Sequence, residues 1–257
     1  MSARQDTQTS LSLLGLDLSG QKVVIIGAGG IGLEVSRICA ALGAVVTMVD
    51  STSASDADLS THFHDSDAYE WLTADITDLS AQDRILSHCK SHDAAIVTVG
   101  VCPDETHIDI DDGTAWHQSF RKILDLNTAA PMRMCQCLLR DMAAKGSGRI
   151  VLTSSLASRT GGLISGAQYT ASKGALNAFS RWLAARAAHS GVSVNCVAPG
   201  VTRTPILGNR EVDPSGIPVG RIAEPIEIAR AIVFLASPAA SYIHGVTLDV
   251  NGGAWMG

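Results

Sequence analysis

The sequence predicts an α/β fold in which a doubly wound parallel sheet of about seven strands carries helices on both faces. Short apolar runs rich in β-branched residues alternate with longer segments of helical periodicity, a pattern typical of parallel sheets with crossover helices. The length of 257 residues suits one large α/β unit with a sizeable core. No internal repeat or linker divides the chain, so we expect one domain over residues 17–257 after a flexible N-terminal arm over residues 1–16.

Each element is placed where its periodicity is clearest. The expected strands lie near residues 22–27, 44–49, 70–74, 94–100, 149–153, 192–197 and 246–250. The expected helices cover residues 30–42, 80–91, 114–144, 168–189 and 225–236. The acidic stretch 104–112 is expected to be an exposed loop.

A glycine-rich turn joins the first expected strand to the first helix. Gly27, Gly29 and Gly32 fit the spacing G-x-G-x-x-G, and this strand–turn–helix context is the one a dinucleotide fingerprint requires. Glycines allow close backbone approach, and the helix N-terminus offers free N–H groups to a pyrophosphate. Asp50 ends the second strand, where a carboxylate binds ribose hydroxyls and repels a 2′-phosphate, which favours NAD over NADP. The alternative is a structural turn followed by a solvated aspartate.

Tyr169 and Lys173 stand four residues apart in an expected helix, so their side chains project from one face. A free phenol has a pKa of about 10 and is a poor proton donor or acceptor at neutral pH. A nearby ammonium lowers that pKa because it favours the phenolate. The pair therefore indicates an acid–base device, and the alternative is a chance pair on a solvated helix.

Two further positions support this interpretation. Ser154 and Ser155 follow an apolar strand, at the edge where open α/β sheets bind ligands, although a serine there also satisfies backbone groups. Pro131 lies inside a long expected helix and has no N–H for the carbonyl of Asn127. The Asn127 oxygen is therefore left for another donor, such as a buried water, unless the proline merely kinks the helix.

From about Leu18 to Gly257 these residues resemble the short-chain dehydrogenase/reductase family. The resemblance implies a Rossmann-type fold and an NAD(H)-dependent oxidoreductase that interconverts a secondary alcohol and a ketone. It implies a catalytic tetrad of Asn127, Ser155, Tyr169 and Lys173. The cofactor residues that it implies are Gly27, Gly29, Gly30, Ile31, Gly32, Asp50, Asp75, Ile76, Val99, Gly100, Tyr169, Lys173, Pro199, Gly200, Val201 and Thr202.

The sequence departs from the family pattern at two places. Ile26 replaces the usual threonine before a glycine loop that is one residue shorter, and Val97-Thr98-Val99-Gly100 stands where the family has Asn-Asn-Ala-Gly. We expect Thr98 to supply some of the hydrogen bonds that the asparagines make. The substrate is expected over Tyr169, between residues 156–168 and 202–220. Its expected apolar wall comprises Leu163, Ile164, Ile206 and Leu207, while Arg203, Arg210 and Glu211 either reach in or face water.

The resemblance also implies a homotetramer. Apolar residues that recur around two long helices support it, because a helix that is apolar on more than one face needs a second surface. These residues are Met132, Met134, Cys135, Leu138, Leu139, Met142, Phe179, Trp182, Leu183 and Ala187. The alternative is that they all belong to the core of their own subunit.

Composition narrows the remaining classes. A net charge of −6 without a basic stripe argues against nucleic acid, and interrupted apolar stretches argue against a membrane span. No secretion signal is visible, and six cysteines without C-x-x-C favour a reducing cytoplasm over zinc or disulfides. The pairs His62/His64 and His88/His92 are expected to be surface residues, with no metal. Two alternatives stay open: a non-catalytic dinucleotide-binding sensor or scaffold, and an epimerase or dehydratase of the same fold.

Overall fold

The computed structural model describes residues 2–53, 63, 68–103, 112–162 and 164–257. A seven-stranded sheet in the order β3-β2-β1-β4-β5-β6-β7 forms its centre, and every neighbouring pair is parallel. The strands are β1 Lys22–Ile26, β2 Val45–Asp50, β3 Tyr69–Thr73, β4 Ala94–Val97, β5 Gly148–Thr153, β6 Val192–Pro199 and β7 Thr247–Val250. The expected fold class is confirmed, and each strand lies within a few residues of its predicted place.

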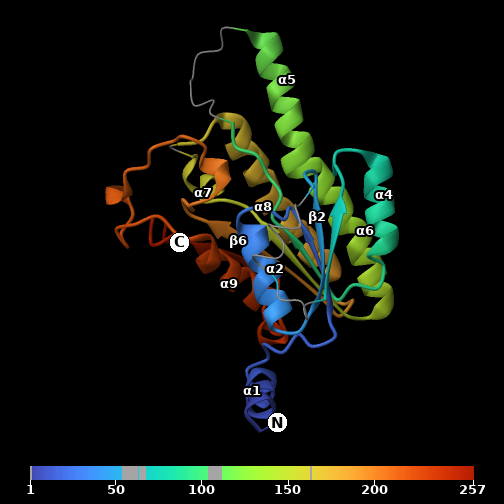
Figure 1. Cartoon of the computed structure of the whole chain (residues 1–257). Coiled ribbons are helices and arrows are strands. Elements are labelled where there is room, and N and C mark those ends of the chain that lie inside the picture. The colour runs from blue at the N-terminus through green and yellow to red at the C-terminus, as the bar shows by residue number, and fades with distance from the viewer. Residues whose placement is uncertain (1, 54–62, 64–67, 104–111, 163) are drawn as a thin grey trace.

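Helices cover both faces of the sheet, as Figure 1 shows. On one face lie α4 Leu79–His88, α6 Ala130–Lys145 and α8 Ala167–Ala187, and on the other lie α2 Ile31–Ala41 and α9 Pro225–Ala236. The apolar strands supply both cores because successive side chains alternate between faces. Val24 and Ile26 pack toward α6 and α8, whereas Val23 and Ile25 pack toward α2 and α9.

The expected long helix from 114 to 144 consists of three consecutive parts. Helix α5 Gly113–Leu124 leads into a π-helical segment, Asp125–Ala129, and then into α6. Pro131 lies in the first turn of α6, where its missing N–H is tolerated. Asn127 lies buried within the π segment, and such single-turn π segments are frequent at functional sites.

The N-terminal segment, which we expected to be a flexible arm, forms a helix over most of its length. Helix α1 covers Ser2–Leu13 and hangs from the main body in Figure 1. Gln8 Nε2 donates to Asp17 Oδ1 at 2.7 Å and to Ser19 Oγ at 2.6 Å. Leu13 is 88% exposed and Leu14 is 62% exposed. The segment is therefore helical, and its flexibility stays a prediction.

Short elements between the main ones were not predicted. They are α7 Ala157–Thr160 and the 3-10 turns Pro205–Leu207, Pro214–Gly216 and Pro238–Ala240. Three of these elements, α7, Pro205–Leu207 and Pro214–Gly216, border the site described below. Most of the acidic stretch 104–112, the pair His62/His64 and Leu163 lie outside the described residues. Across the part of the chain that is described, no helix combines the length and apolar character that crossing a membrane requires.

Strand order reverses between β1 and β4, which are hydrogen-bonded neighbours although β2 and β3 lie between them in sequence. The crevice at the carboxyl ends of strands beside such a reversal is where open α/β sheets bind ligands. The glycine turn, Gly100 and Ser155 follow β1, β4 and β5 at this edge. The fold therefore brings together segments that are far apart in the sequence.

Candidate active site

Two adjoining hollows occupy this edge of the sheet. A groove of about 800 Å³ runs past the glycine turn and the ends of β2 and β4. A smaller cavity of about 320 Å³ lies beside it. Both are lined by Thr98, Gly100 and Cys102, so they form one continuous site.

Most residues implied in cofactor binding line one of the two hollows. The groove is lined by Gly27, Gly29, Gly30, Ile31, Asp50, Asp75, Ile76, Val99 and Gly100. The cavity is lined by Ile31, Gly100, Ser155, Tyr169, Lys173, Pro199, Gly200, Val201 and Thr202. Gly32 lies behind the groove, buried at the start of α2.

The glycines of the turn serve different purposes. Gly27 has φ 94°, and a Cβ there would come within 2.5 Å of the Val99 nitrogen. A Cβ on Gly32 would collide with the Gly27 carbonyl oxygen. Gly29, in contrast, faces open space, with no atom within 4 Å of its Cβ position. Gly27 and Gly32 are thus required by packing, while Gly29 keeps the groove open.

The groove fits a dinucleotide. No side chain caps the N-terminus of α2, whose first residues follow Gly30 at the groove, so its N–H groups suit a pyrophosphate. One carboxylate oxygen of Asp50 accepts from the Ala28 nitrogen at 2.9 Å, and the other accepts from Thr52. Carboxylate oxygens have further lone pairs, which leaves Asp50 able to accept from ribose hydroxyls.

Thr98 supplies part of the hydrogen bonding expected from the asparagines of the family's Asn-Asn-Ala-Gly segment, which this chain lacks. Its Oγ1 donates to the Gly27 carbonyl at 2.5 Å and lies 3.3 Å from the Ile26 carbonyl. This bond ties the segment after β4 to the glycine turn, as we expected. Gly100 follows at a position where a Cβ would come within 3.0 Å of Lys173 Nζ.

Asn127 is fully buried, and its side chain joins two segments of the site. Its Oδ1 accepts from the Val101 nitrogen, and its Nδ2 donates to the Val101 oxygen, both at 2.9 Å. The same Nδ2 donates to Ser172 Oγ at 3.1 Å. The side chain thereby clamps the segment after β4 against α8.

Lys173 is buried between the ends of two strands. Its Nζ donates to the Thr153 carbonyl at 3.1 Å and to the Val99 carbonyl at 3.4 Å. Burial lowers the pKa of Lys173 to about 8, because a desolvated ammonium is disfavoured.

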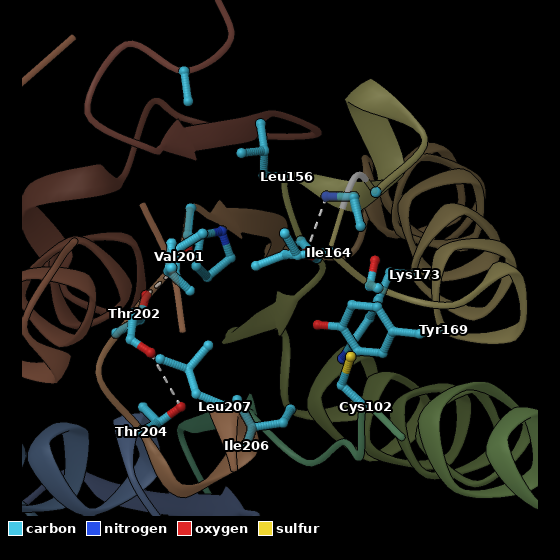
Figure 2. Close-up of a pocket in the computed structure, with 18 of the residues that line it drawn as sticks. Cys102, Leu156, Ile164, Tyr169, Lys173, Val201, Thr202, Thr204, Ile206 and Leu207 are labelled. Carbon is cyan, nitrogen blue, oxygen red and sulfur yellow. Dashed lines mark hydrogen bonds between the residues drawn. The ribbon is translucent and has the colours of Figure 1, made fainter. Parts of the chain in front are cut away.

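Tyr169 points its hydroxyl into the cavity from α8, as Figure 2 shows. Burial raises its pKa to about 12, while a hydrogen bond from Ser155 and the charge of Arg210 lower it. The sequence-based expectation that Lys173 lowers this pKa is not met, since burial outweighs every favourable contribution. Lys173 Nζ lies 5.9 Å from the centroid of the tyrosine ring.

The two serines after β5 have different surroundings. Ser154 is buried and donates to the Lys173 carbonyl at 2.9 Å, which fixes the start of the segment to α8. Ser155 hydrogen-bonds Tyr169 and accepts from the Ala157 nitrogen at 3.1 Å. Of the two, Ser155 is therefore the one placed beside the phenol.

The segment 202–213 closes the cavity opposite Tyr169. Figure 2 shows Ile206 and Leu207 across from the tyrosine, with Ile164 on another wall. Arg203 faces outward and pairs with Glu224 at 3.0 Å, and Glu211 is exposed. Arg210 lines the cavity, so of the two arginines that were expected either to reach in or to face water, Arg210 is the one that reaches in.

Sequence reasoning missed Cys102, which lines both hollows and lies beside Tyr169. Its position two residues after Gly100 is the one signal that the sequence offers for it. Of the second histidine pair, His88 is exposed as expected, with its Nε2 2.7 Å from Glu70. His92 is buried, contrary to the expectation of a surface residue, and its Nε2 lies 3.0 Å from Thr47 Oγ1.

Comparison with known proteins places this geometry in a family. A family model described as enoyl-(acyl carrier protein) reductase matches residues 26–254. A solved structure described as a short-chain dehydrogenase/reductase family protein is 33% identical, with a TM-score of 0.83 over 92% of this chain and 98% of that one. The chain belongs to the short-chain dehydrogenase/reductase family.

Two relatives of this short-chain dehydrogenase/reductase carry more specific descriptions. A cis-4-hydroxycyclohexanecarboxylate dehydrogenase from Sinomonas cyclohexanicum is 33% identical over 90% of this chain and 94% of its own length. A crystal structure from Beutenbergia cavernae is described as a candidate NAD(P) dependent gluconate 5-dehydrogenase with bound NADP at low occupancy. It is 30% identical and has a TM-score of 0.85, over 93% of this chain and 98% of that one.

The glycine turn yields the first prediction. Gly29→Ala should leave the free energy of unfolding within about 0.5 kcal/mol of wild type, because the new methyl meets no atom, yet weaken NADH binding at least tenfold. Gly32→Ala should cost about 2 kcal/mol or more, because its methyl collides with backbone. Urea unfolding and NADH fluorescence titration measure the two effects. Equal NADH affinity in wild type and Gly29→Ala would contradict the expected approach of a pyrophosphate.

The second prediction concerns Lys173 and pH. The folded state releases the lysine proton near pH 8, whereas the unfolded chain releases it near 10.5. Below pH 8 the burial penalty is therefore fully present, and wild-type stability rises with pH between 8 and 10.5. Lys173→Met should be more stable than wild type at pH 7, by up to about 3 kcal/mol.

This advantage should shrink as the pH rises through the same window. Urea unfolding at several pH values measures it, with Lys122→Met, an exposed lysine at the groove, as the control. An advantage of Lys173→Met that stays constant from pH 8 to 10.5 would show that the buried charge does not cause it.

Proposed function

We propose that the chain is an NAD(H)-dependent oxidoreductase that interconverts a secondary alcohol and a ketone. One observation carries the proposal: Tyr169, Ser155 and Lys173 meet in a cavity that opens directly onto the dinucleotide-sized groove. When bound, the nicotinamide supplies the hydride chemistry. The chain's own residues orient the substrate and move the proton.

Tyr169 exchanges the proton of the substrate hydroxyl. Its raised pKa keeps the phenol protonated at neutral pH, which suits a proton donor during ketone reduction. Ser155 hydrogen-bonds the same phenol, so it is placed to hold the substrate oxygen and to stabilise charge that develops there. Alcohol oxidation needs the phenolate and is therefore favoured by higher pH.

Lys173 and Asn127 complete the tetrad from behind the tyrosine. Lys173 lines the cavity beside Gly100, which borders the groove as well, so its Nζ would hold the nicotinamide ribose. The side chain of Asn127 is occupied by Val101 and Ser172. Its backbone oxygen, to which Pro131 offers no N–H, is the group that positions a water between Lys173 and solvent.

The preferred cofactor in this proposal is NAD(H). Asp50 lines the groove at the end of β2, and Ser51, Thr52 and Ser53 follow it without a basic residue. A carboxylate facing a phosphate is a like-charge contact that costs several kcal/mol. The relative with bound NADP shows that the family fold also accepts the phosphorylated cofactor, so Asp50 is the feature to test.

We also propose that residues 17–257 act as one domain in a homotetramer in the cytoplasm. Most of the apolar residues that first supported assembly lie in the subunit's own core, among them Met134, Leu138 and Leu183. The remaining support is the exposed apolar surface on α8, α9 and β7. It comprises Trp182, Phe234, Leu248 and Val246, the last of which directly precedes β7.

Tyr169→Phe should lower kcat for ketone reduction by about 10²–10⁴-fold, the usual contribution of a positioned proton donor. Only the hydroxyl is lost, so NADH affinity should stay within about twofold. Stopped-flow NADH oxidation in a screen of ketones measures the rate, and fluorescence titration gives the affinity. Activity within threefold of wild type would remove Tyr169 from the proposed role. NADH binding without turnover of any substrate would favour a sensor.

Asp50→Ala should narrow the preference for NADH over NADPH at least tenfold, since it removes a charge that repels the 2′-phosphate. The ratio of kcat/KM for the two cofactors, in wild type and variant, measures it. Lys122→Met serves as the control because Lys122 is a cation at the same groove. Wild-type enzyme that uses NADPH as well as NADH would overturn the assignment of Asp50.

Light scattering at micromolar concentration should give four times the mass of one chain. Trp182→Glu should shift the population to smaller species, because it places a charge on a side chain that is 42% exposed in the single chain and is expected at a subunit contact. A wild-type mass equal to one chain would refute the tetramer.

A further inference from the structure

One wall of the cavity is built from three segments that are far apart in the sequence. The first is α7 with the residue before it, the second follows the turn Pro214–Gly216, and the third is the C-terminal segment after β7. The contacts that hold these segments together therefore fix the width of the cavity at this end. The lining residues that the segments contribute, which we call the α7 wall, are Leu156, Ala157, Thr160, Ile217 and Ala254.

Arg159 connects α7 to the last strand and to the C-terminal segment. Its Nε and Nη2 donate to the two carboxylate oxygens of Asp249 at 3.2 and 3.1 Å, and Nη2 also donates to the Thr247 carbonyl at 3.4 Å. The guanidinium carbon lies 4.7 Å from the centroid of the Trp255 ring, within the range of a cation–π contact. The two paired side chains are only 20% and 17% exposed, so water and salt screen this pair less than a surface pair.

The turn after β7 carries the position of Trp255 to the α7 wall. Asn251 is buried, its Nδ2 donates to the Trp255 carbonyl at 3.1 Å, and its Oδ1 accepts from the Gly253 nitrogen at 3.0 Å. The Asn251 carbonyl accepts from the Ala254 nitrogen at 3.2 Å. Because Ala254 directly precedes Trp255, an indole that is held by Arg159 also holds this part of the wall.

The same turn supports the segment that follows Pro214–Gly216. The Val219 nitrogen donates to the Gly252 carbonyl at 3.1 Å. A Cβ on Gly252 would come within 3.0 Å of Ile217 Cγ2, so the isoleucine packs closely on the turn. The place of Ile217 in the cavity therefore depends on the place of the turn.

We propose that Arg159 is a positioning residue that holds the C-terminal segment against α7 and thereby limits the size of substrate that the cavity admits. Arg159 does not itself line the cavity, so it acts through Ala254 and Ile217. The inference rests on the proposed function and adds a size limit to it. The cavity of about 320 Å³ is at the small end of ligand pockets, so a displaced wall changes its capacity.

Two neutral ketones that differ in size test the limit. Cyclohexanone and 2-decalone both carry a ring ketone, and 2-decalone has a second, fused ring. Wild type should prefer cyclohexanone at least about tenfold in kcat/KM, because a cavity of this volume is at the lower limit for ligands. Arg159→Met removes the forked pair and the stacked charge. It should raise KM for cyclohexanone about tenfold, with kcat within about threefold and NADH affinity within about twofold of wild type, because uniform binding alone is lost. The preference for cyclohexanone should fall at least about fivefold.

Further variants separate positioning from a loss of stability. Arg159→Met/Asp249→Asn removes the carboxylate charge that the single variant leaves without its partner, and it should show the same loss of preference. Trp255→Ala should reproduce the effect, whereas Trp255→Phe keeps an aromatic face for the guanidinium and should retain most of the preference. Lys145→Met is the matched control, because it breaks an ion pair with Asp93 at 2.6 Å whose residues do not line the cavity. It should leave the kinetics with both ketones unchanged.

Hydrogen exchange and binding separate this proposal from the proposed function, because neither requires turnover. Arg159→Met should speed amide exchange about tenfold or more in peptides that cover residues 251–257 and 214–220, while peptides over β1 and β4 stay unchanged. Calorimetric titration of the NAD-saturated protein with cyclohexanol and decahydro-2-naphthol should show the same preference in wild type and its loss in the variant. These results without turnover of any ketone would support the role of Arg159 and refute the oxidoreductase.

Three results would overturn the proposal. Wild type that prefers the single ring in neither turnover nor binding would show that the cavity sets no such limit. Equal losses of kcat/KM for both ketones in Arg159→Met would show that the arginine only stabilises the fold. Turnover of cyclohexanone with unchanged exchange in residues 251–257 of the variant would refute the role of Arg159 alone.

Discussion

The buried ammonium of Lys173 is the constraint on which the arrangement of the site depends. Two strand-end carbonyls, Val99 and Thr153, accept its hydrogen bonds, so β4, β5 and α8 must meet at one point. Gly100 is needed there because a Cβ would press on Nζ. The parallel sheet satisfies these requirements because all its strands end at the same edge. The placement of the proposed catalytic lysine and the cost of burying its charge are therefore two consequences of one packing arrangement.

Much of the fold could be predicted from local sequence patterns. β1 and its glycine turn follow from an apolar run and three glycines, and Asp50 follows from the end of the next strand. These features could be predicted because each depends on neighbours in sequence. Helix α1 could not, since the polar segment Ser2–Leu13 has no apolar stripe to mark it. The π segment was signalled by Pro131, but a proline alone does not tell a kink from a bulge.

Periodicity shows that a side chain is buried without showing what buries it. Met134 and Leu183 occupy the apolar faces that suggested a subunit contact, yet they pack within their own chain against the sheet. Trp182, one residue before Leu183, stays exposed. Arg203 and Arg210 lie in an irregular loop, where no periodicity indicates which of them is buried. Which arginine enters the cavity depends on the path of an irregular segment, and only tertiary structure decides it.

The departures from the family pattern show that a geometry can be kept by different atoms. Thr98 donates to the Gly27 carbonyl and so holds the shortened glycine turn against the segment after β4. The Asn127 side chain holds the other end of that segment, because it hydrogen-bonds both the backbone N–H and the carbonyl of Val101. Between these two clamps lie Val99, whose carbonyl accepts from Lys173 Nζ, and Gly100, where a Cβ would come within 3.0 Å of that Nζ. The segment tolerates loss of the family's asparagines because its ends are fixed from two sides, which preserves the position of the lysine.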